Sequence, residues 1–178
     1  MKTEKVLVII DMQNDFLTGS LANPDAVKIV PDVARLAGEW QGRIIFTRDT
    51  HKSEYLNTQE GKYLPVEHCI ENTDGWQIDE EILASALNNE FAKVSYVDKP
   101  AFGAGTLLYD EIMRVGEPSQ VVFVGTCTDI CVVSNALILK SLLPEVPMSV
   151  VADCCAGLTP DKHASALDVM SSCQISII

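Results

Sequence analysis

Six short runs of apolar, largely β-branched residues recur along the chain, and they constrain its fold more than any other feature. Hydrophobicity in these runs is nearly continuous rather than alternating, which is typical of strands buried on both faces of a sheet. Segments with apolar residues at helical spacing lie between several of these runs. We expect strands at residues 5–10, 43–47, 93–97, 121–125, 148–152 and 174–178, and helices at residues 25–40, 104–115, 131–143 and 160–172.

This alternation predicts an α/β fold, namely a three-layer α/β/α sandwich with a six-stranded, mostly parallel central sheet. A chain of 178 residues can bury a large core, and we assign residues 1–178 to a single domain. Pro31 lies inside the first helical pattern and is expected to mark a first turn rather than a helix interior. Segment 131–143 is apolar nearly all round, so we expect a buried helix there.

Charge and composition exclude several classes of function. The formal net charge is −12 and no cluster of Lys or Arg occurs, so the basic surface of a nucleic-acid-binding protein is missing. Strongly acidic partners are disfavoured for the same reason. The apolar run before Asp11 is too short for a signal peptide or a membrane span. We therefore expect a cytoplasmic protein with no membrane partner, in which the six cysteines are reduced thiols.

Three polar residues, Asp11, Lys99 and Cys131, follow expected strands, and sites in parallel sheets form at the carboxyl ends of strands. Taken alone, Asp11 fits a turn residue and Lys99 fits a solvated surface charge. Side by side, the two would stabilise each other's charged forms. At the start of a helix, Cys131 would have a lowered pKa. A thiolate with a carboxylate base and an ammonium group is suited to acyl transfer through a thioester.

Cys127 also belongs to this region, because the stretch VGTCTDICVV places it four residues before Cys131. A reducing compartment disfavours a disulfide between them. A non-catalytic thiol protein, either redox-sensing or structurally zinc-binding, is the alternative from another functional class. Asp11 and Lys99 favour the enzyme hypothesis, because a disulfide switch would need neither of them.

The region 49–80 is a long irregular stretch, which we expect to be an ordered and functional loop. Two imidazoles and two carboxylates in it suit a divalent transition metal such as zinc, iron or manganese. The alternative is that these are ordinary polar residues of a loop surface. His163, in the last helical segment, is expected to be a plain surface residue. The four candidate ligands are Asp49, His51, Glu60 and His68.

Five segments together resemble the isochorismatase-like cysteine hydrolase superfamily, and specifically its nicotinamidase/pyrazinamidase branch. The pairing of IIDMQNDF with GTCTDICV is specific, and the segments follow the order found in that family. The resemblance implies the isochorismatase-like α/β fold and a hydrolase activity. The segments are VIIDMQNDF (8–16), TRDTH (47–51), LPVEHC (64–69), DKPAFGAGT (98–106) and GTCTDICV (125–132).

The resemblance implies roles for the residues at the strand ends. Cys131 matches the nucleophile, Asp11 the base that takes its proton and later protonates the leaving group, and Lys99 the electrostatic partner. The family's cis peptide bond corresponds to Thr126–Cys127. The backbone N–H groups of Cys127 and Cys131 correspond to the oxyanion hole.

The resemblance also implies a metal site. Asp49, His51 and His68 match the metal-binding positions of nicotinamidases, and Glu60 resembles the acidic ligand of some members. Asn57 stands where other members have histidine. One divalent ion is implied, with zinc first and iron or manganese as alternatives. Sibling isochorismatases and carbamoyl hydrolases generally lack such a site, which favours the nicotinamidase branch.

The substrate implied by the resemblance is nicotinamide, hydrolysed to nicotinate and ammonia through a thioester. Phe16 matches the aromatic residue that stacks on the pyridine ring. The family's tryptophan before the second metal histidine is absent, and Leu64 or Tyr63 stands nearby. The alternative substrate is therefore another small amide, a carbamoyl compound or a vinyl ether. The two apolar C-terminal elements offer surface for a homo-oligomer.

Overall fold

Strand β1 lies inside a six-stranded sheet whose order is β3-β2-β1-β4-β5-β6, and every strand pairing described in this sheet is parallel. The computed structural model describes residues 4–178. The predicted domain starts at residue 1, so its first three positions lie outside the described part. The predicted six-stranded α/β sheet is confirmed. The strands are β1 (Lys5–Ile10), β2 (Gly42–Asp49), β3 (Ala92–Lys99), β4 (Gln120–Thr126), β5 (Met148–Ala156) and β6 (Ser176–Ile177).

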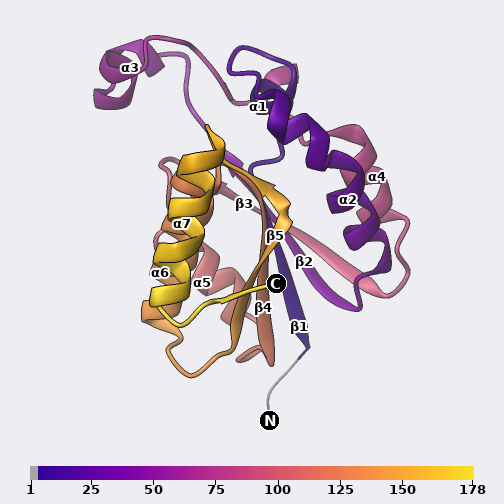
Figure 1. Ribbon diagram of the computed structural model, residues 1–178. Helices are drawn as coiled ribbons and strands as arrows, with labels where there is room; N and C mark the ends of the chain where they lie inside the picture. Colours follow the sequence, from indigo (N-terminus) through magenta and orange to yellow (C-terminus); the bar gives the residue numbers. More distant parts are fainter. Residues whose placement is uncertain (1–3) are drawn as a thin grey trace.

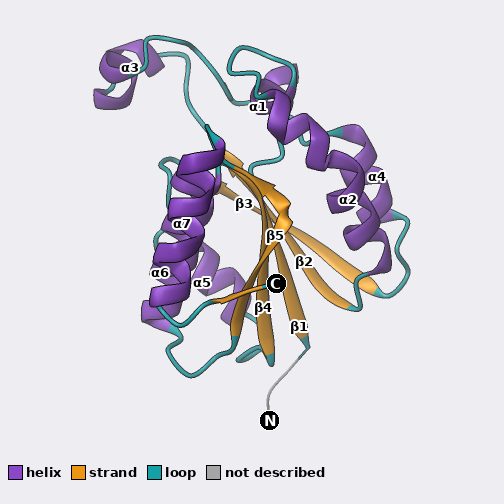
Figure 2. Ribbon diagram, in the orientation of Figure 1, coloured by secondary structure: helices purple, strands orange, loops and turns teal. Residues whose placement is uncertain are grey.

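Helices cover both faces of the sheet and thereby form the three layers (Figures 1 and 2). Helices α2 and α4 pack on one face, and α5, α6 and α7 pack on the other. The short helices α1 and α3 lie beyond the carboxyl ends of the strands (Figure 1). The helices are α1 (Asn14–Leu17), α2 (Pro24–Glu39), α3 (Gln59–Tyr63), α4 (Glu80–Leu87), α5 (Thr106–Met113), α6 (Val133–Leu142) and α7 (Pro160–Ser172).

The expectation for Pro31 is wrong, because this residue lies in the interior of α2. Pro24 occupies the first turn instead, and the side chain of Asn23 caps the helix by accepting a hydrogen bond from Asp25 N at 3.0 Å. Pro31 is exposed, so its ring points away from the sheet. An interior proline costs about 3 kcal/mol. The buried face of α2 offsets that cost with Ala26, Ile29, Val30, Val33, Ala34 and Ala37.

The helix expected to be buried at 131–143 is buried on one face only. The α-helical part begins at Val133, after a one-turn π-helix, Thr128–Val132. Leu142 is 41% exposed, so the outer face of α6 is open to solvent. Apolar composition did not distinguish a helix on the outside of the sheet from a central one. The buried residues of α6 are Asn135, Ala136 and Leu139.

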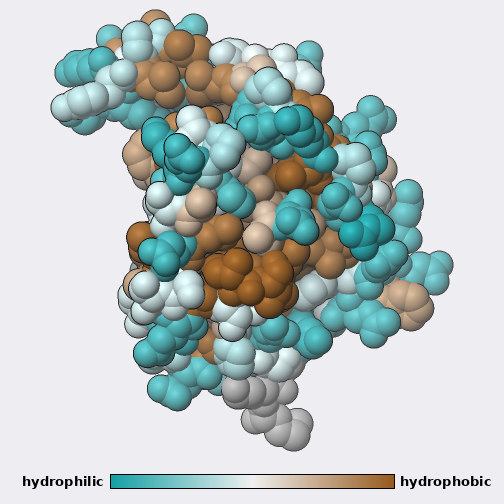
Figure 3. Space-filling model, in the orientation of Figure 1, coloured by the Kyte–Doolittle hydropathy of each residue, from teal (hydrophilic) through white to brown (hydrophobic). Residues whose placement is uncertain are grey.

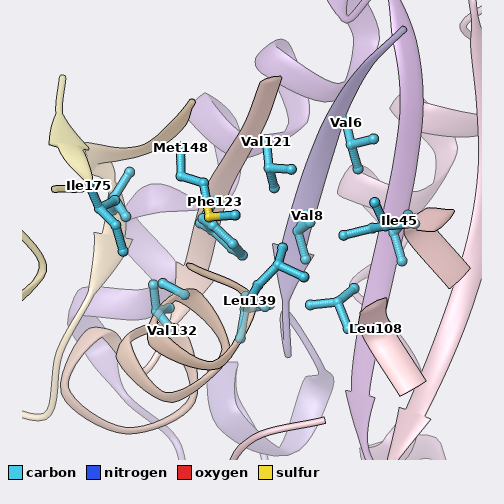
Figure 4. Packing of buried hydrophobic residues seen from close by; sticks show 14 of the residues in the cluster. Val6, Val8, Ile45, Leu108, Val121, Phe123, Val132, Leu139, Met148 and Ile175 are labelled. Carbon is cyan, nitrogen blue, oxygen red and sulfur yellow. The ribbon is translucent and has the colours of Figure 1, made fainter. Parts of the chain in front are cut away.

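The core consists of two clusters, one on each side of the sheet. Alternate residues of β1 face opposite clusters, so that Val8 meets the α5–α7 side and Ile9 meets the α2–α4 side. Figure 4 shows Val8 between Ile45 and Phe123 on the first of these sides. Burial of each such side chain contributes about 1.5–3 kcal/mol. The continuous apolar pattern of β1 follows from this burial on both faces.

The sheet order reverses between β1 and β4, since β2 and β3 extend on one side and β5 and β6 on the other. Such a switch point opens a crevice at the carboxyl ends of the strands. Four strand ends, those of β1 to β4, meet there. Among residues 4–178, no helix combines the length and the apolar character needed to cross a membrane.

Candidate active site

A buried ion pair joins the ends of two strands that are not neighbours. Asp11 directly follows β1, and Lys99 ends β3, with β2 between them. Lys99 Nζ lies 2.7 Å from Asp11 Oδ2 and 3.5 Å from Asp49 Oδ1. Both Asp11 and Lys99 are fully buried. The long side chain of Lys99 therefore reaches across the end of β2, and its ammonium group lies between two carboxylates.

The charge states of this pair follow from burial and mutual attraction. Burial raises the pKa of Asp11, while Lys99 opposes that rise, and Thr47 Oγ1 donates to Asp11 Oδ1 at 2.6 Å. Burial alone would lower the pKa of Lys99, but the negative charge of Asp11, with a smaller contribution from Asp49, holds it above its usual value. Lys99 is therefore an ammonium group at neutral pH.

Cys131 lies in the π-helical turn after β4, with Sγ 3.6 Å from Lys99 Nζ. The predicted lowering of its pKa by a helix N-terminus is wrong. Burial comes first in raising the pKa of the thiol, the charge of Asp11 adds to it, and Lys99 opposes it. A hydrogen bond with Asp11 also favours the protonated thiol. Asp11 is thus placed to accept the proton when the sulfur attacks a substrate.

The turn that carries Cys131 starts from an unusual backbone. The peptide bond Thr126–Cys127 is cis, at the position implied by the family resemblance. Gly125 has φ +117°, and Thr126 Oγ1 donates to Ala156 O at 3.0 Å. The peptide groups of Cys127 and Cys131 therefore lie in one short turn at the end of β4.

His163 also contacts this turn, contrary to the prediction of a plain surface residue. Its Nδ1 lies 2.8 Å from Oγ1 of Thr128, the first residue of the π-helical turn. Asp129 Oδ1 accepts from Leu158 N at 2.9 Å. Helix α7 and the loop after β5 thus form hydrogen bonds to the turn from its outer side. The sequence carried no signal for this, because the partner residues lie roughly thirty positions apart.

The four candidate metal ligands form one group beside the Asp11–Lys99 pair. One ligand atom from each of Asp49, His51, Glu60 and His68 lies within 4.8 Å of all the others. His51 Nε2 is 2.9 Å from Asp49 Oδ2 and 3.7 Å from Glu60 Oε1. His68 Nε2 is 3.5 Å from Asp49 Oδ2 and 3.8 Å from Glu60 Oε1. Two imidazole nitrogens and two carboxylates fit a divalent transition metal.

The electrostatics of the group fit a cation. Burial raises the pKa of Asp49, but hydrogen bonds from His51 and His68 and the charge of Lys99 hold it well below its usual range. His68 Nδ1 donates to Val66 O at 2.8 Å, since a carbonyl oxygen can only accept. In the neutral imidazole with its proton on Nδ1, Nε2 has the lone pair that a metal ligand requires, and a bound cation would take the place of the proton that Nε2 shares with Asp49.

Backbone hydrogen bonds hold the far part of the long loop, around residues 69–71, beside the end of β2. His51 N donates to Cys69 O at 3.0 Å, and Glu71 N donates to His51 O at 2.9 Å. The Tyr55 ring packs against His51 and His68, with centroid distances of 4.6 and 4.9 Å. Asn57, which stands where other members of the family have histidine, is exposed.

A cavity of about 220 Å³ connects Cys131 to the ligand group. Leu64 lines it, whereas Tyr63 is 83% exposed and does not, so the structure distinguishes between these two candidates. The Phe16 ring lies 5.7 Å from the His68 ring. Polar residues at the ends of strands located the site in the sequence, but they did not indicate the apolar residues that line the cavity. The lining residues are Phe16, Leu21, Asn23, Asp49, Glu60, Leu64, His68, Phe102, Cys127, Ile130, Cys131 and Leu158.

Comparisons with known proteins agree with this arrangement. The family model for the isochorismatase domain matches residues 5–178. The chain is 29% identical to the nicotinamidase of Saccharomyces cerevisiae over 126 residues, which is 53% of this chain and 56% of that protein. It is 26% identical to the nicotinamidase of Escherichia coli, over 94% of this chain and 91% of that protein. The crystal structure of the pyrazinamidase of Pyrococcus horikoshii in complex with zinc superimposes with a TM-score of 0.77 at 27% identity, covering 99% of each chain.

Proposed function

Because the chain belongs to the isochorismatase domain family, we propose that it is a metal-dependent cysteine amidohydrolase that converts nicotinamide to nicotinate and ammonia. One observation carries the proposal: a single cavity has Cys131 in one part of its wall and the ligands Asp49, Glu60 and His68 in another. Relatives named as nicotinamidases, aligned over most of the chain, support this substrate.

The reaction begins at Cys131. Asp11 takes the thiol proton as Cys131 Sγ bonds to the carboxamide carbon. Lys99, 3.6 Å from the sulfur, stabilises the negative charge that develops there. The N–H groups of Cys127 and Cys131 donate to the oxygen of the tetrahedral intermediate. Buried surroundings strengthen each of these interactions, because little water screens them.

Asp11 then acts as a general acid. Its proton passes to the amide nitrogen, the C–N bond breaks, and ammonia leaves a thioester on Cys131. Asp11 next takes a proton from water, whose oxygen bonds to the thioester carbon. The C–S bond breaks, the sulfur recovers a proton from Asp11, and the acid product leaves as nicotinate after giving its remaining proton to solvent. Asp11 thus serves both half-reactions, as its contact with Lys99 and Cys131 allows.

Asp49, His51, Glu60 and His68 would hold one divalent ion, for which we propose zinc, with iron and manganese as alternatives. The bound ion supplies a Lewis acid for the pyridine nitrogen and thereby orients the substrate. Phe16 and Leu64 provide the apolar contacts for the ring. Elemental analysis of the purified protein identifies the metal.

Ammonia release from nicotinamide by the zinc-loaded protein tests the proposed activity. We expect turnover by the wild type and none above background with Cys131→Ala. If neither protein releases ammonia from nicotinamide or from a panel of related amides, the proposal is wrong.

In a second candidate function, Asp11, Lys99 and Cys131 have the same roles but the substrate is different. Leu64 lines the cavity near His68, where the family's tryptophan is missing, so stacking on an aromatic ring is weaker. Another small amide, a carbamoyl compound or a vinyl ether would then be hydrolysed. Turnover that is insensitive to Asp49→Ala and His51→Ala favours this candidate, because only the pyridine substrate depends on the metal for orientation.

Two further expectations accompany the proposal. A cytoplasmic location suits a nucleophilic cysteine, and all six cysteines are free thiols. Self-association stays a prediction: Figure 3 shows apolar side chains gathered near the C-terminus, where Ile178 is 63% exposed.

A further inference from the structure

Asn135 is a buried amide next to the nucleophile and has no part in the reaction described above. It lies in α6, four residues after Cys131, and is 2% exposed. Its Oδ1 accepts from Ala104 N at 2.8 Å, and its Nδ2 donates to Phe102 O at 3.0 Å and to Cys131 O at 2.8 Å. All three partners are backbone groups, so the hydrogen bonds set the position of chain segments rather than of side chains.

These hydrogen bonds join two segments that both contribute to the site. One is the turn of Cys131, and the other is the loop 100–105 that follows Lys99. In the same loop, Ala101 O accepts from Lys99 Nζ at 3.1 Å. Phe102 lines the cavity. The amide of Asn135 therefore connects the backbone that carries the nucleophile to the backbone that holds the ammonium group.

Close packing supports the same connection. A Cβ added to Gly103 would overlap the side chain of Ile138 in α6, so the loop lies directly against the helix. Only an amide can accept from Ala104 N and donate to two carbonyl oxygens at once. A carboxylate of the same shape would face the carbonyls of Phe102 and Cys131 with a lone pair.

We propose that Asn135 is a positioning residue that keeps Cys131 Sγ within reach of Lys99 Nζ by fixing the Cys131 turn against loop 100–105. This inference rests on the proposed role of Cys131 as the nucleophile. Its consequence is that loss of the amide donors displaces the thiol from Lys99 and lowers its reactivity. A displacement of about 1 Å in a catalytic geometry can cost about a hundredfold in rate.

The chain contains a matched control for this residue. Asn89 is also buried, at 8% exposed, and lies away from the cavity lining. Its Nδ2 donates to Ala37 O and Trp40 O, both at 2.8 Å, and its Oδ1 accepts from Phe91 N at 2.9 Å. Asn89→Asp thus removes the same two donors and retains the same kind of acceptor as Asn135→Asp does. A general loss of stability should appear in both variants.

The test compares Asn135→Asp with Asn89→Asp in two measurements below their unfolding temperatures. The first is the rate constant for alkylation of Cys131 by iodoacetamide, followed by peptide mass spectrometry. The second is kcat for nicotinamide. We expect slower alkylation and a kcat lowered roughly tenfold to a hundredfold in Asn135→Asp only, with the Asn89→Asp values close to wild type.

Equal values in the two Asp variants overturn the inference. If Asn135→Asp does not fold, Asn135→Ser replaces it: a serine hydroxyl can reach Cys131 O one turn earlier but cannot bridge to the loop. Slower alkylation in Asn135→Ser again supports the inference, and a wild-type rate overturns it. Alkylation needs no substrate, so it tests Asn135 even if nicotinamide is not hydrolysed.

Discussion

At the scale of single residues, the fully buried Lys99 places one ammonium charge beside two carboxylates. Its Nζ contacts Asp11 at 2.7 Å and Asp49 at 3.5 Å. We predict that Lys99→Met abolishes turnover and lowers the free energy of unfolding by about 3–5 kcal/mol, because it leaves buried charge uncompensated. Chemical denaturation of the metal-free protein measures the stability, and ammonia release measures the activity.

The matched control for this change is Lys52→Met. Lys52 pairs with Glu71 on the surface and is 61% exposed, so its loss should hardly change the free energy of unfolding. Similar denaturation midpoints for the two variants would contradict a structural role of the buried ammonium group. Retained turnover in Lys99→Met would contradict its electrostatic role.

Cys127 and Cys131 lie in one turn but have different proposed roles. Cys127 contributes a backbone N–H group, which alanine retains, whereas Cys131 contributes its sulfur. We predict that Cys127→Ala retains much of the wild-type kcat, while Cys131→Ala loses more than about a thousandfold. Steady-state kinetics with nicotinamide measure both. Comparable losses in the two variants would show that the Cys127 thiol itself takes part.

The sequence predicted the positions of some site residues better than those of others. Asp11 and Lys99 interrupt or end apolar runs, so their place at strand ends was evident. Thr47 and Asn135 are neutral polar residues within elements, and nothing local indicates that they hydrogen-bond to the site. The pKa of Cys131 was predicted in the wrong direction, because burial and the charge of Asp11 raise it more than the charge of Lys99 lowers it.

At the scale of elements, the end of β4 fits against β1 only with glycine at position 125. Gly125 has φ +117°, and a Cβ there would overlap the carbonyl oxygen of Ile10. We predict that Gly125→Ala lowers the free energy of unfolding by at least about 3 kcal/mol, from backbone strain and steric overlap together. Urea denaturation measures the change.

Gly105 is the control for that substitution. It also has a positive φ, +56°, but a Cβ there would meet nothing within 4 Å. Gly105→Ala should therefore cost only the backbone strain, about 1–3 kcal/mol. An equal loss in both variants would mean that the contact with Ile10 relaxes and that conformation alone determines the cost.

Elements could be predicted where hydrophobic periodicity was strong. The six strands and the helices α2, α5, α6 and α7 follow from apolar runs and their spacing, whereas α4 (Glu80–Leu87) was not predicted. The interior position of Pro31 did not, because the burial of one face of α2 outweighs the local penalty. The irregular β4–β5 pairing between Phe123 and Gly125, and the pairing of His51 with Ile70, bring together distant positions that no local pattern records.

At the scale of the whole molecule, the strand order determines which side chains become neighbours. Running β3-β2-β1-β4, the sheet edge presents Lys99, Asp49, Asp11 and then the turn of Cys131. The sequence predicted a common edge, since parallel strands place their carboxyl ends together. It did not predict the order, because apolar strands buried on both faces carry little information about their partners. The link from Lys99 across β2 to Asp11 therefore required the structure.

Binding of a metal ion to Asp49, His51, Glu60 and His68 should stabilise the whole folded chain. These ligands come from the end of β2 and from the long loop, and a cation held by them binds the folded chain far better than the unfolded one. At a zinc concentration a hundredfold above Kd, the stabilisation is about 2.7 kcal/mol. For a protein of this size, we predict a rise in Tm of roughly 5–10 °C on adding zinc to chelator-treated protein.

Two histidine variants separate site binding from nonspecific binding in this thermal measurement. His68→Ala removes a ligand and should lose most of the zinc-induced rise in Tm. His163→Ala, which removes the hydrogen bond to Thr128 and no metal ligand, should retain it. Both variants have one histidine fewer in the unfolded chain, so zinc binding to the unfolded state is matched between them. An equal zinc response in the two variants would mean that zinc stabilises the fold from elsewhere, and the assignment of the four ligands would be wrong.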